Sequence, residues 1–95
     1  MYTFKRSTHF KKNYKKLVKN NEFIESKIIN TLQKLAEDPF QISLRTHNVV
    51  AKGIGKSKST TVTGDIRIIW NFDTDSKTIL LLLNIGGHSG SRSVY

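Results

Sequence analysis

Residues 64–88, GDIRIIWNFDTDSKTILLLLNIGGH, contain the pattern that decides the fold. In the first half, apolar residues occupy positions 66, 68 and 70, while Arg67 lies between two of them. Because successive side chains of a β-strand point to opposite faces, one face is apolar and the other displays Arg67. A polar turn follows at residues 73–76, and the mostly apolar run at residues 78–85, with four consecutive leucines, is typical of a strand covered on both faces. The stretch therefore predicts a β-hairpin.

The two ends of this hairpin define the candidate functional site. If the strands pair antiparallel, the residues that end the second strand lie beside those that begin the first. Gly86, Gly87 and His88 then come close to Asp65 and Arg67. An aspartate, an arginine and a histidine would meet there.

The composition fits one small domain, residues 1–95, that is stabilised by packing. The chain has no cysteine, which excludes disulfides and Cys-containing zinc sites, and its three well-separated histidines make a poor metal set. We therefore predict neither a metal site nor another cofactor. The basic N-terminus precedes no long apolar segment, and the leucine run is too short to span a bilayer. These features predict a cytoplasmic protein without a membrane partner.

The charge distribution predicts a polyanionic partner. The chain has 16 Lys and Arg against 7 Asp and Glu, a formal net charge of +9. Residues 1–20 contain seven basic residues and no acid, and residues 39–64 again contain basic residues and no acid. Nucleic acid, an acidic protein or both would complement such a surface.

The N-terminal part predicts a short strand followed by two helices. Aromatic and polar side chains alternate over residues 2–6, which favours a strand. Ser7 or Thr8 can cap a first helix with apolar residues at positions 10, 14 and 17 and lysines over much of the remaining surface. The asparagines at positions 20 and 21 can cap a second helix, which we expect to end at about Glu37, before Asp38 and the proline that follows.

The remaining segments complete an α+β arrangement. We expect Phe40 and Ile42 to anchor the crossing to the sheet, and residues 43–52 to form a strand or extended edge, with core candidates Leu44, Val49 and Val50. Residues 52–63 begin as a basic loop and continue as a strand. The string GIGKS within this loop lacks the first glycine of a P-loop, so nucleotide triphosphate binding is not predicted. The expected fold has two N-terminal helices packed on a three- or four-stranded antiparallel sheet.

Several of these strings resemble the RelE/ParE superfamily of bacterial toxins, which belong to type II toxin–antitoxin systems. The resemblance covers nearly the whole chain. It rests on DPF and LRTH, on DIRIIW, on LLLNIGGH ending at His88, and on the closing RSVY. It implies a RelE/ParE-like fold and a ribosome-dependent endoribonuclease, an mRNA interferase, that cuts mRNA in the decoding site. It also implies a cognate antitoxin that holds the enzyme inactive.

The resemblance also implies roles for individual residues. Arg67 matches the arginine that stabilises the scissile phosphate. Positions 47, 65 and 88 match catalytic positions of the YafQ-like branch, and the terminal tyrosine matches an aromatic that stacks on a base or assists the chemistry. The implied catalytic residues are thus His47, Asp65, Arg67, His88 and Tyr95. The basic residues expected to bind RNA are Arg45, Lys52, Lys56, Lys58 and Arg92.

Independently of the family resemblance, the residue types fit the chemistry of RNA cleavage. The reaction needs a base for the 2′-hydroxyl proton, a cation for the charge on the phosphorane and an acid for the leaving 5′-oxygen. His47 or His88 can act as base or acid near neutral pH, and Asp65 can orient either. Arg67 offers a planar charged fork for phosphate oxygens. No metal is required.

Structural roles and two other functions remain open from the sequence. Arg67 could pair with Asp65 or Asp73 at the surface, and Asp65 could simply shape the turn. A ParE-like inhibitor of DNA gyrase is the alternative within the superfamily, although it needs no titrating histidines. A non-catalytic nucleic-acid-binding module is the third interpretation, because three positions depart from the family pattern: Thr61, Asn84 and Ser89.

Overall fold

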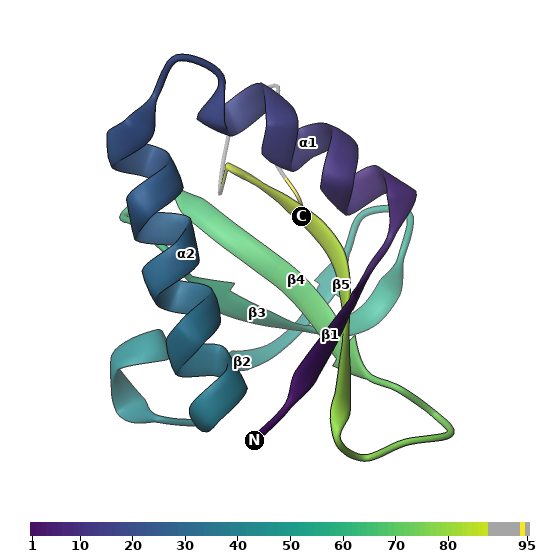
Figure 1. Ribbon diagram of the computed structural model, residues 1–95. Coiled ribbons are helices and arrows are strands. Elements are labelled where there is room, and N and C mark those ends of the chain that lie inside the picture. The colour runs from purple at the N-terminus through teal and green to yellow at the C-terminus, as the bar shows by residue number, and fades with distance from the viewer. Residues whose placement is uncertain (88–93, 95) are drawn as a thin grey trace.

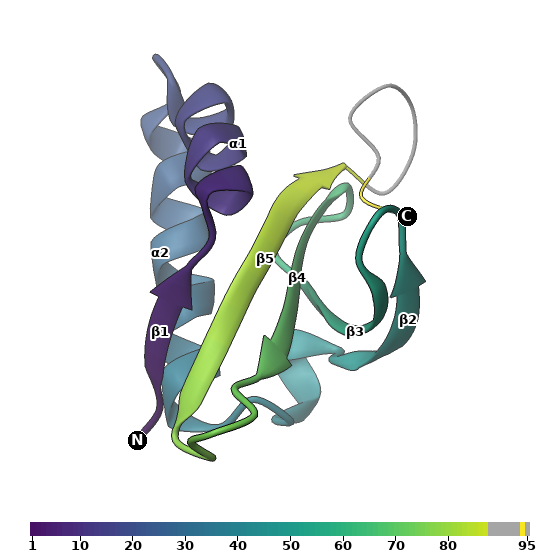
Figure 2. The ribbon, with the colours of Figure 1, turned by 90° about the vertical axis from the view of Figure 1, so that its right-hand side faces the viewer.

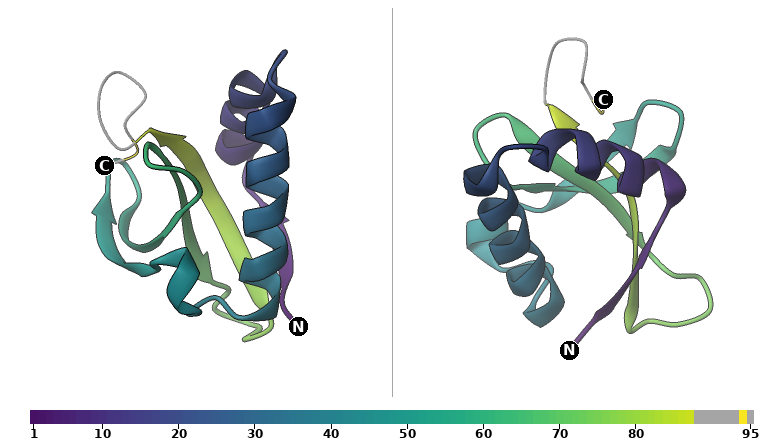
Figure 3. Two further views of the ribbon diagram at one scale, coloured as in Figure 1. Left: turned by 90° about the vertical axis from the view of Figure 1, so that its left-hand side faces the viewer. Right: turned by 45° about the horizontal axis from the view of Figure 1, so that its top comes forward.

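Two helices cover one face of a five-stranded sheet in the computed structural model, which describes residues 1–87 and Val94 (Figure 1). Figure 3 shows both helices on the same side of the strands. No helix within the described part is long and apolar enough to cross a membrane. The elements in chain order are β1 (Thr3–Arg6), α1 (Thr8–Val18), α2 (Glu22–Glu37), the 3₁₀ turn η1 (Ile42–Leu44), β2 (His47–Ala51), β3 (Gly55–Thr61), β4 (Ile66–Phe72) and β5 (Ile79–Gly87).

The sheet has the order β1-β5-β4-β3-β2, and β1 runs parallel to β5 while the other neighbours are antiparallel. The α+β class is confirmed, but the expected three- or four-stranded, wholly antiparallel sheet is wrong. The N–H of Thr3 donates to the carbonyl oxygen of Thr78 at 2.9 Å, and that of Ser7 donates to Leu82 at 2.9 Å. The strand predicted at residues 2–6 is confirmed as β1. A four-residue strand pattern contains no information about a distant partner, so only the three-dimensional structure reveals that β1 joins the sheet beside β5 and runs parallel to it.

The predicted hairpin is confirmed as β4 and β5. Ile66 pairs with Gly87 and Arg67 with Gly86, so the two glycines reach the start of β4 as expected. The register shifts between Ile69 and Trp70, because Asn84 faces Ile69 whereas Leu82 faces Trp70. Leu83 is therefore an extra residue in β5, a β-bulge.

The helix ends agree with their predicted capping residues. The Ser7 hydroxyl accepts from the N–H of Phe10 at 3.0 Å, and the Asn21 side chain accepts from the N–H of Ile24 at 3.1 Å. The Tyr14 hydroxyl links the helices by donating to Glu25 at 3.3 Å. Partial burial, reinforced by the Glu25 charge, raises the pKa of Tyr14 above its ordinary value.

The main core lies between the helices and the sheet. Its buried apolar residues come from α1, α2, η1, β4 and β5: Phe10, Ile28, Leu35, Leu44, Ile66, Ile68, Trp70, Leu80, Leu82 and Ile85.

Val50, expected in the core, is 73% exposed, and Ile42, expected to anchor the crossing to the sheet, is 94% exposed. Phe40 is 56% exposed, but its ring centre lies 6.1 Å from those of Trp70 and Phe72, so it anchors the crossing as expected. Leu44, a predicted core residue, is buried, as is Pro39. Residues two apart in a 3₁₀ turn point in different directions, so Leu44 faces the core while Ile42 faces solvent. Val50 lies opposite Lys56 in the edge hairpin of β2 and β3.

Candidate active site

Two of the residues predicted to act on RNA, His47 and Arg67, lie on β2 and β4. Arg67 and Ile69 point to the sheet face opposite the main core, since Ile66, Ile68 and Trp70 point into that core. His47 is on the same face, because it pairs with Ser59 and Ser59 pairs with Ile69. We call this surface the inner face and the other the helix face. His47 and Arg67 are two strands apart, a lateral separation of about 10 Å in a flat sheet.

The sheet curls toward the inner face. Figure 2 shows β2 and β3 bending away from β4 and β5 on the side opposite the helices. Val94 links the end of β5 to the residue that follows β2. Its N–H donates to the carbonyl oxygen of Gly87 at 3.0 Å, and its own carbonyl oxygen accepts from the N–H of Lys52 at 3.3 Å. In a flat sheet the strands that Val94 links would be about 14 Å apart. Val94 packs in a second buried cluster with Ala51 and Ile69, which fills part of the inner face.

Arg67 is held in place by the turn between β3 and β4. Its side chain is half-buried, and Nη1 donates to the carbonyl oxygens of Thr63 at 2.6 Å and of Ile66 at 3.2 Å. The Thr63 hydroxyl accepts from the N–H groups of Asp65 at 3.2 Å and Ile66 at 3.0 Å, which fixes the turn itself. A guanidinium has five N–H donors on three nitrogens, and these two bonds involve only Nη1. The arginine is therefore oriented before any ligand binds.

Asp65 is exposed at the end of that turn, two residues before Arg67. Its backbone N–H donates to the Thr63 hydroxyl, so Asp65 takes part in shaping the turn. Its catalytic role stays a prediction.

His47 begins β2 as an exposed residue. Its Nδ1 lies 2.9 Å from the carbonyl oxygen of Arg45. A carbonyl oxygen only accepts, so this contact assigns the proton to Nδ1 and leaves the lone pair of the neutral ring on Nε2. Arg45 itself adopts a left-handed conformation, φ 50°, at the end of η1, which brings its carbonyl to the ring. The local fold thus orients an imidazole with Nε2 as a proton acceptor.

The basic residues predicted to bind RNA are divided between two sides. Arg45 adjoins His47, and Lys52 is linked through Val94 to the end of β5, so both lie around the inner face. Lys58 pairs with Trp70 and its Nζ lies 5.7 Å from the Phe72 ring centre, which places it on the helix face. Lys56 has the same strand parity as Lys58. Their RNA-binding roles stay predictions.

Three predicted site residues, His88, Arg92 and Tyr95, lie outside the described residues. Two residues that organise the site were not predicted from the sequence. Thr63 holds Arg67, and the only sequence signal was its place in a Thr-Gly-Asp turn. Val94 closes the inner face, and a single valine near the chain end gives no such signal.

Two of the departures from the family pattern are also placed by the structure. Thr61 pairs directly with Arg67. Asn84 is buried, accepts from the Asn13 side chain at 2.7 Å and from the N–H of Ile85 at 2.8 Å, and so fixes α1 to β5. Asn84 has a structural role at the bulge.

The described residues do not bring three histidine, aspartate or glutamate side chains together as a metal site.

Several solved structures share this fold. No protein-family model and no curated protein matches the sequence. The YoeB/ParE toxin from Agrobacterium tumefaciens matches with a TM-score of 0.73 at 15% identity, over 92% of this chain and 99% of its own. YafQ in the E. coli DinJ–YafQ complex matches with a TM-score of 0.68 at 17% identity, over 93% and 94%. A metal-bound toxin from Helicobacter pylori matches with a TM-score of 0.68 at 24% identity, over 93% and 96%. The predicted RelE/ParE-like fold is confirmed.

Proposed function

We propose that this protein is the toxin of a type II toxin–antitoxin pair and that it cleaves mRNA on the ribosome. Its partners are then a cognate antitoxin and ribosome-bound mRNA, and it acts in the cytoplasm. The observation that carries the proposal is the pre-oriented Arg67 on a basic inner face shared with His47. The fold shared with YafQ, whose structure is known in complex with DinJ, supports the antitoxin partner.

The proposed reaction uses the residues of the inner face without a metal. Nε2 of His47 accepts the proton of an RNA 2′-hydroxyl, and the oxygen attacks the adjacent phosphorus. Arg67 donates to the oxygens that gain charge in the phosphorane. The P–O5′ bond breaks, a second acid, assigned to His88 or Tyr95, protonates the leaving oxygen, and Asp65 orients a histidine. The products are a 2′,3′-cyclic phosphate and a 5′-hydroxyl.

The alternatives differ in what they require from His47. A gyrase inhibitor or a binding module needs no proton acceptor, yet the Arg45 carbonyl holds the ring with Nε2 as the acceptor. This observation favours the nuclease. The basic surface by itself is compatible with all three.

The test is controlled expression in cells with mapping of mRNA 5′ ends. We expect codon-phased cuts with the native chain, and at least a 100-fold loss with Arg67→Ala or His47→Ala, because each removes a transition-state interaction. His88→Ala tests the second histidine. Lys77→Ala, an exposed lysine in the turn between β4 and β5, is the matched control and should cleave normally.

Two outcomes would contradict the nuclease. Growth arrest with intact mRNA and blocked DNA supercoiling would indicate gyrase inhibition. Intact mRNA without any growth phenotype would indicate a non-catalytic module.

A further inference from the structure

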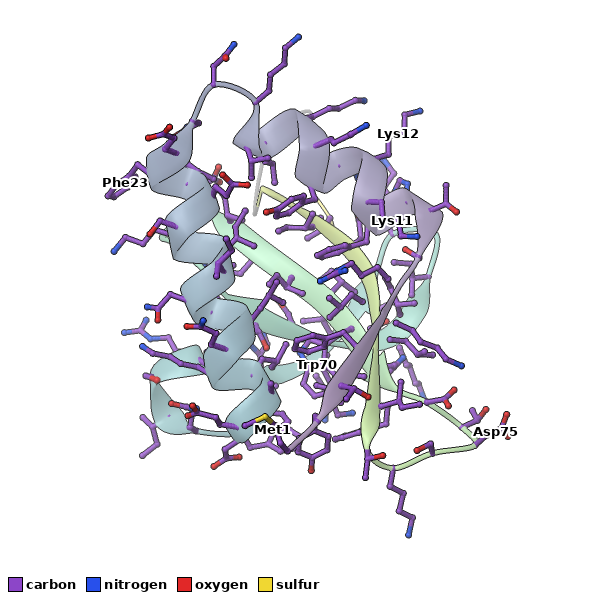
Figure 4. The ribbon with its side chains drawn as sticks, viewed as in Figure 1. Met1, Lys11, Lys12, Phe23, Trp70 and Asp75 are labelled. Atoms are coloured by element: carbon purple, nitrogen blue, oxygen red, sulfur yellow. The ribbon has the colours of Figure 1, made fainter. Side chains whose placement is uncertain are left out.

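A chain of side-chain hydrogen bonds runs from the main core to the residue that precedes His47. It begins at Trp70, which is fully buried in the interior of the protein (Figure 4). The indole Nε1–H of Trp70 donates to the Thr60 hydroxyl at 2.8 Å, and the Thr46 hydroxyl lies 2.7 Å from the same oxygen. Two hydroxyl groups therefore connect the core to the segment that carries the candidate base.

The hydroxyl of Thr60 has the right capacity for both contacts. An indole N–H only donates, so the Thr60 oxygen accepts from Trp70 and still has its own proton and a further lone pair for Thr46. Either threonine can donate in the contact between the two hydroxyls. Thr60 is fully buried, and a buried hydroxyl with an unused proton is unfavourable, which favours retention of the contact.

Thr46 follows the residue whose backbone sets the His47 tautomer. Arg45 has the left-handed conformation φ 50°, ψ 37°, which is unfavourable for a residue with a Cβ atom and persists only where its surroundings hold it. Leu44, the residue before it, is buried in the main core, and Thr46, the residue after it, is bonded to Thr60. Arg45 is thus anchored on both sides, with its carbonyl oxygen 2.9 Å from Nδ1 of His47.

The pairing of strands does not fix this carbonyl. β2 begins at His47, which pairs with Ser59, so Arg45 and Thr46 precede the paired residues. Thr60 pairs with Ile68 of the main core, so Thr46 reaches the core side of the sheet while His47 lies on the inner face. The Thr46 hydroxyl can therefore hold the backbone from the core side and leave the imidazole open to a ligand.

We propose that Thr46 is a positioning residue for His47: its bond to Thr60 holds the Arg45 carbonyl against Nδ1 and so keeps Nε2 as the proton acceptor. The benefit for RNA cleavage rests on the proposed function. The position of the proton is a property of the free protein, so it is measured without RNA. A merely structural bond would lower stability when removed and leave the tautomer unchanged.

The experiment records the nitrogen-15 NMR signals of the imidazole rings in the full chain labelled at histidine. In mildly alkaline buffer an imidazole is neutral, and the separation between its Nδ1 and Nε2 shifts reports which nitrogen carries the proton. The chain has three histidines, so His47→Gln assigns the signal, and the exposed His9 of α1 is an internal reference.

The variants separate the hydroxyl of Thr46 from its shape. Thr46→Val removes the hydroxyl and keeps the shape, Thr46→Ala removes the hydroxyl without adding a methyl group, and Thr46→Ser keeps the hydroxyl. The matched control is Thr31→Val, because the Thr31 hydroxyl donates to the carbonyl oxygen of Lys27 within α2 at 2.9 Å. Folding is monitored by the indole N–H signal of Trp70, the only tryptophan, whose acceptor Thr60 is present in every variant.

We expect Thr46→Val and Thr46→Ala to reduce the separation of the His47 shifts to about half of the native value or less, because the ring then samples both tautomers. Thr46→Ser and Thr31→Val should retain it. On ribosomes programmed with mRNA, Thr46→Val should lower kcat about tenfold with KM within about twofold, and Thr46→Ser should restore it.

Two results would overturn the proposal. A native shift separation in folded Thr46→Val or Thr46→Ala would show that other contacts hold the carbonyl. An equal change in Thr46→Ser or Thr31→Val would show that the tautomer responds to any loss of packing. Absence of cleavage by the native chain would contradict the proposed function alone, because the NMR measurement is made on the free protein.

Discussion

Arg67 and His47 show how the surrounding backbone gives a side chain its chemical role. The carbonyl of Thr63 orients the guanidinium, and the carbonyl of Arg45 selects the His47 tautomer. Both anchors are backbone carbonyl oxygens in turns, and the Thr63 hydroxyl fixes the turn that carries the first of them. The alternation over residues 64–70 predicted which face Arg67 occupies, but not the atoms that hold it.

The contribution of Thr60 to the stability of the protein can be measured. The buried Trp70 indole Nε1–H donates to its hydroxyl at 2.8 Å, and the Thr46 hydroxyl lies 2.7 Å from the same oxygen. Thr60→Val keeps the shape but leaves the indole N–H without this acceptor, at a cost of about 1 to 3 kcal/mol. Urea unfolding should show this loss, whereas Thr61→Val, at a half-buried position, should change stability by less than about 0.5 kcal/mol. Equal effects would contradict the assignment.

At the scale of elements, local patterns predicted local structure well. Ser7 and Asn21 cap the helices as expected, and β4 and β5 form the expected hairpin. Contacts between distant segments were not predictable, because neither the short β1 nor Val50 has a pattern that identifies its neighbours. β1 pairs in parallel with β5, and Val50 is exposed on the edge strand β2.

The role of Val94 in closing the inner face between β5 and β2 can be tested by substitution. It is 2% exposed and packs with Ala51 and Ile69. Val94→Asp places a charge in this apolar cluster, so the segment should detach and the Lys52 amide, which donates to Val94, should lose protection from hydrogen exchange. Val50→Asp, at a position 73% exposed, is the control and should leave that amide protected. Unchanged exchange in Val94→Asp would contradict the role of Val94 in closure.

At the scale of the whole molecule, the sheet separates two surfaces of different character. The inner face carries His47 and Arg67, and the helical layer carries a groove with a basic edge. The net charge of +9 favours an anionic partner on either surface. Composition alone predicted an anionic partner, but only the curl of the sheet and the packing of the helices separate the two surfaces.

The central claim, cleavage through the 2′-hydroxyl on the inner face, is tested most directly on ribosomes programmed with a defined mRNA. The site that the purified protein cuts is first mapped, and the mRNA is then remade with one 2′-deoxynucleotide before that bond. We expect the all-ribose mRNA to give a 5′-hydroxyl end, and the deoxy mRNA to remain intact at that bond, because the attacking oxygen is absent. Cleavage that persists at the deoxy position, a 5′-phosphate product, or full activity of Arg67→Ala would contradict the account.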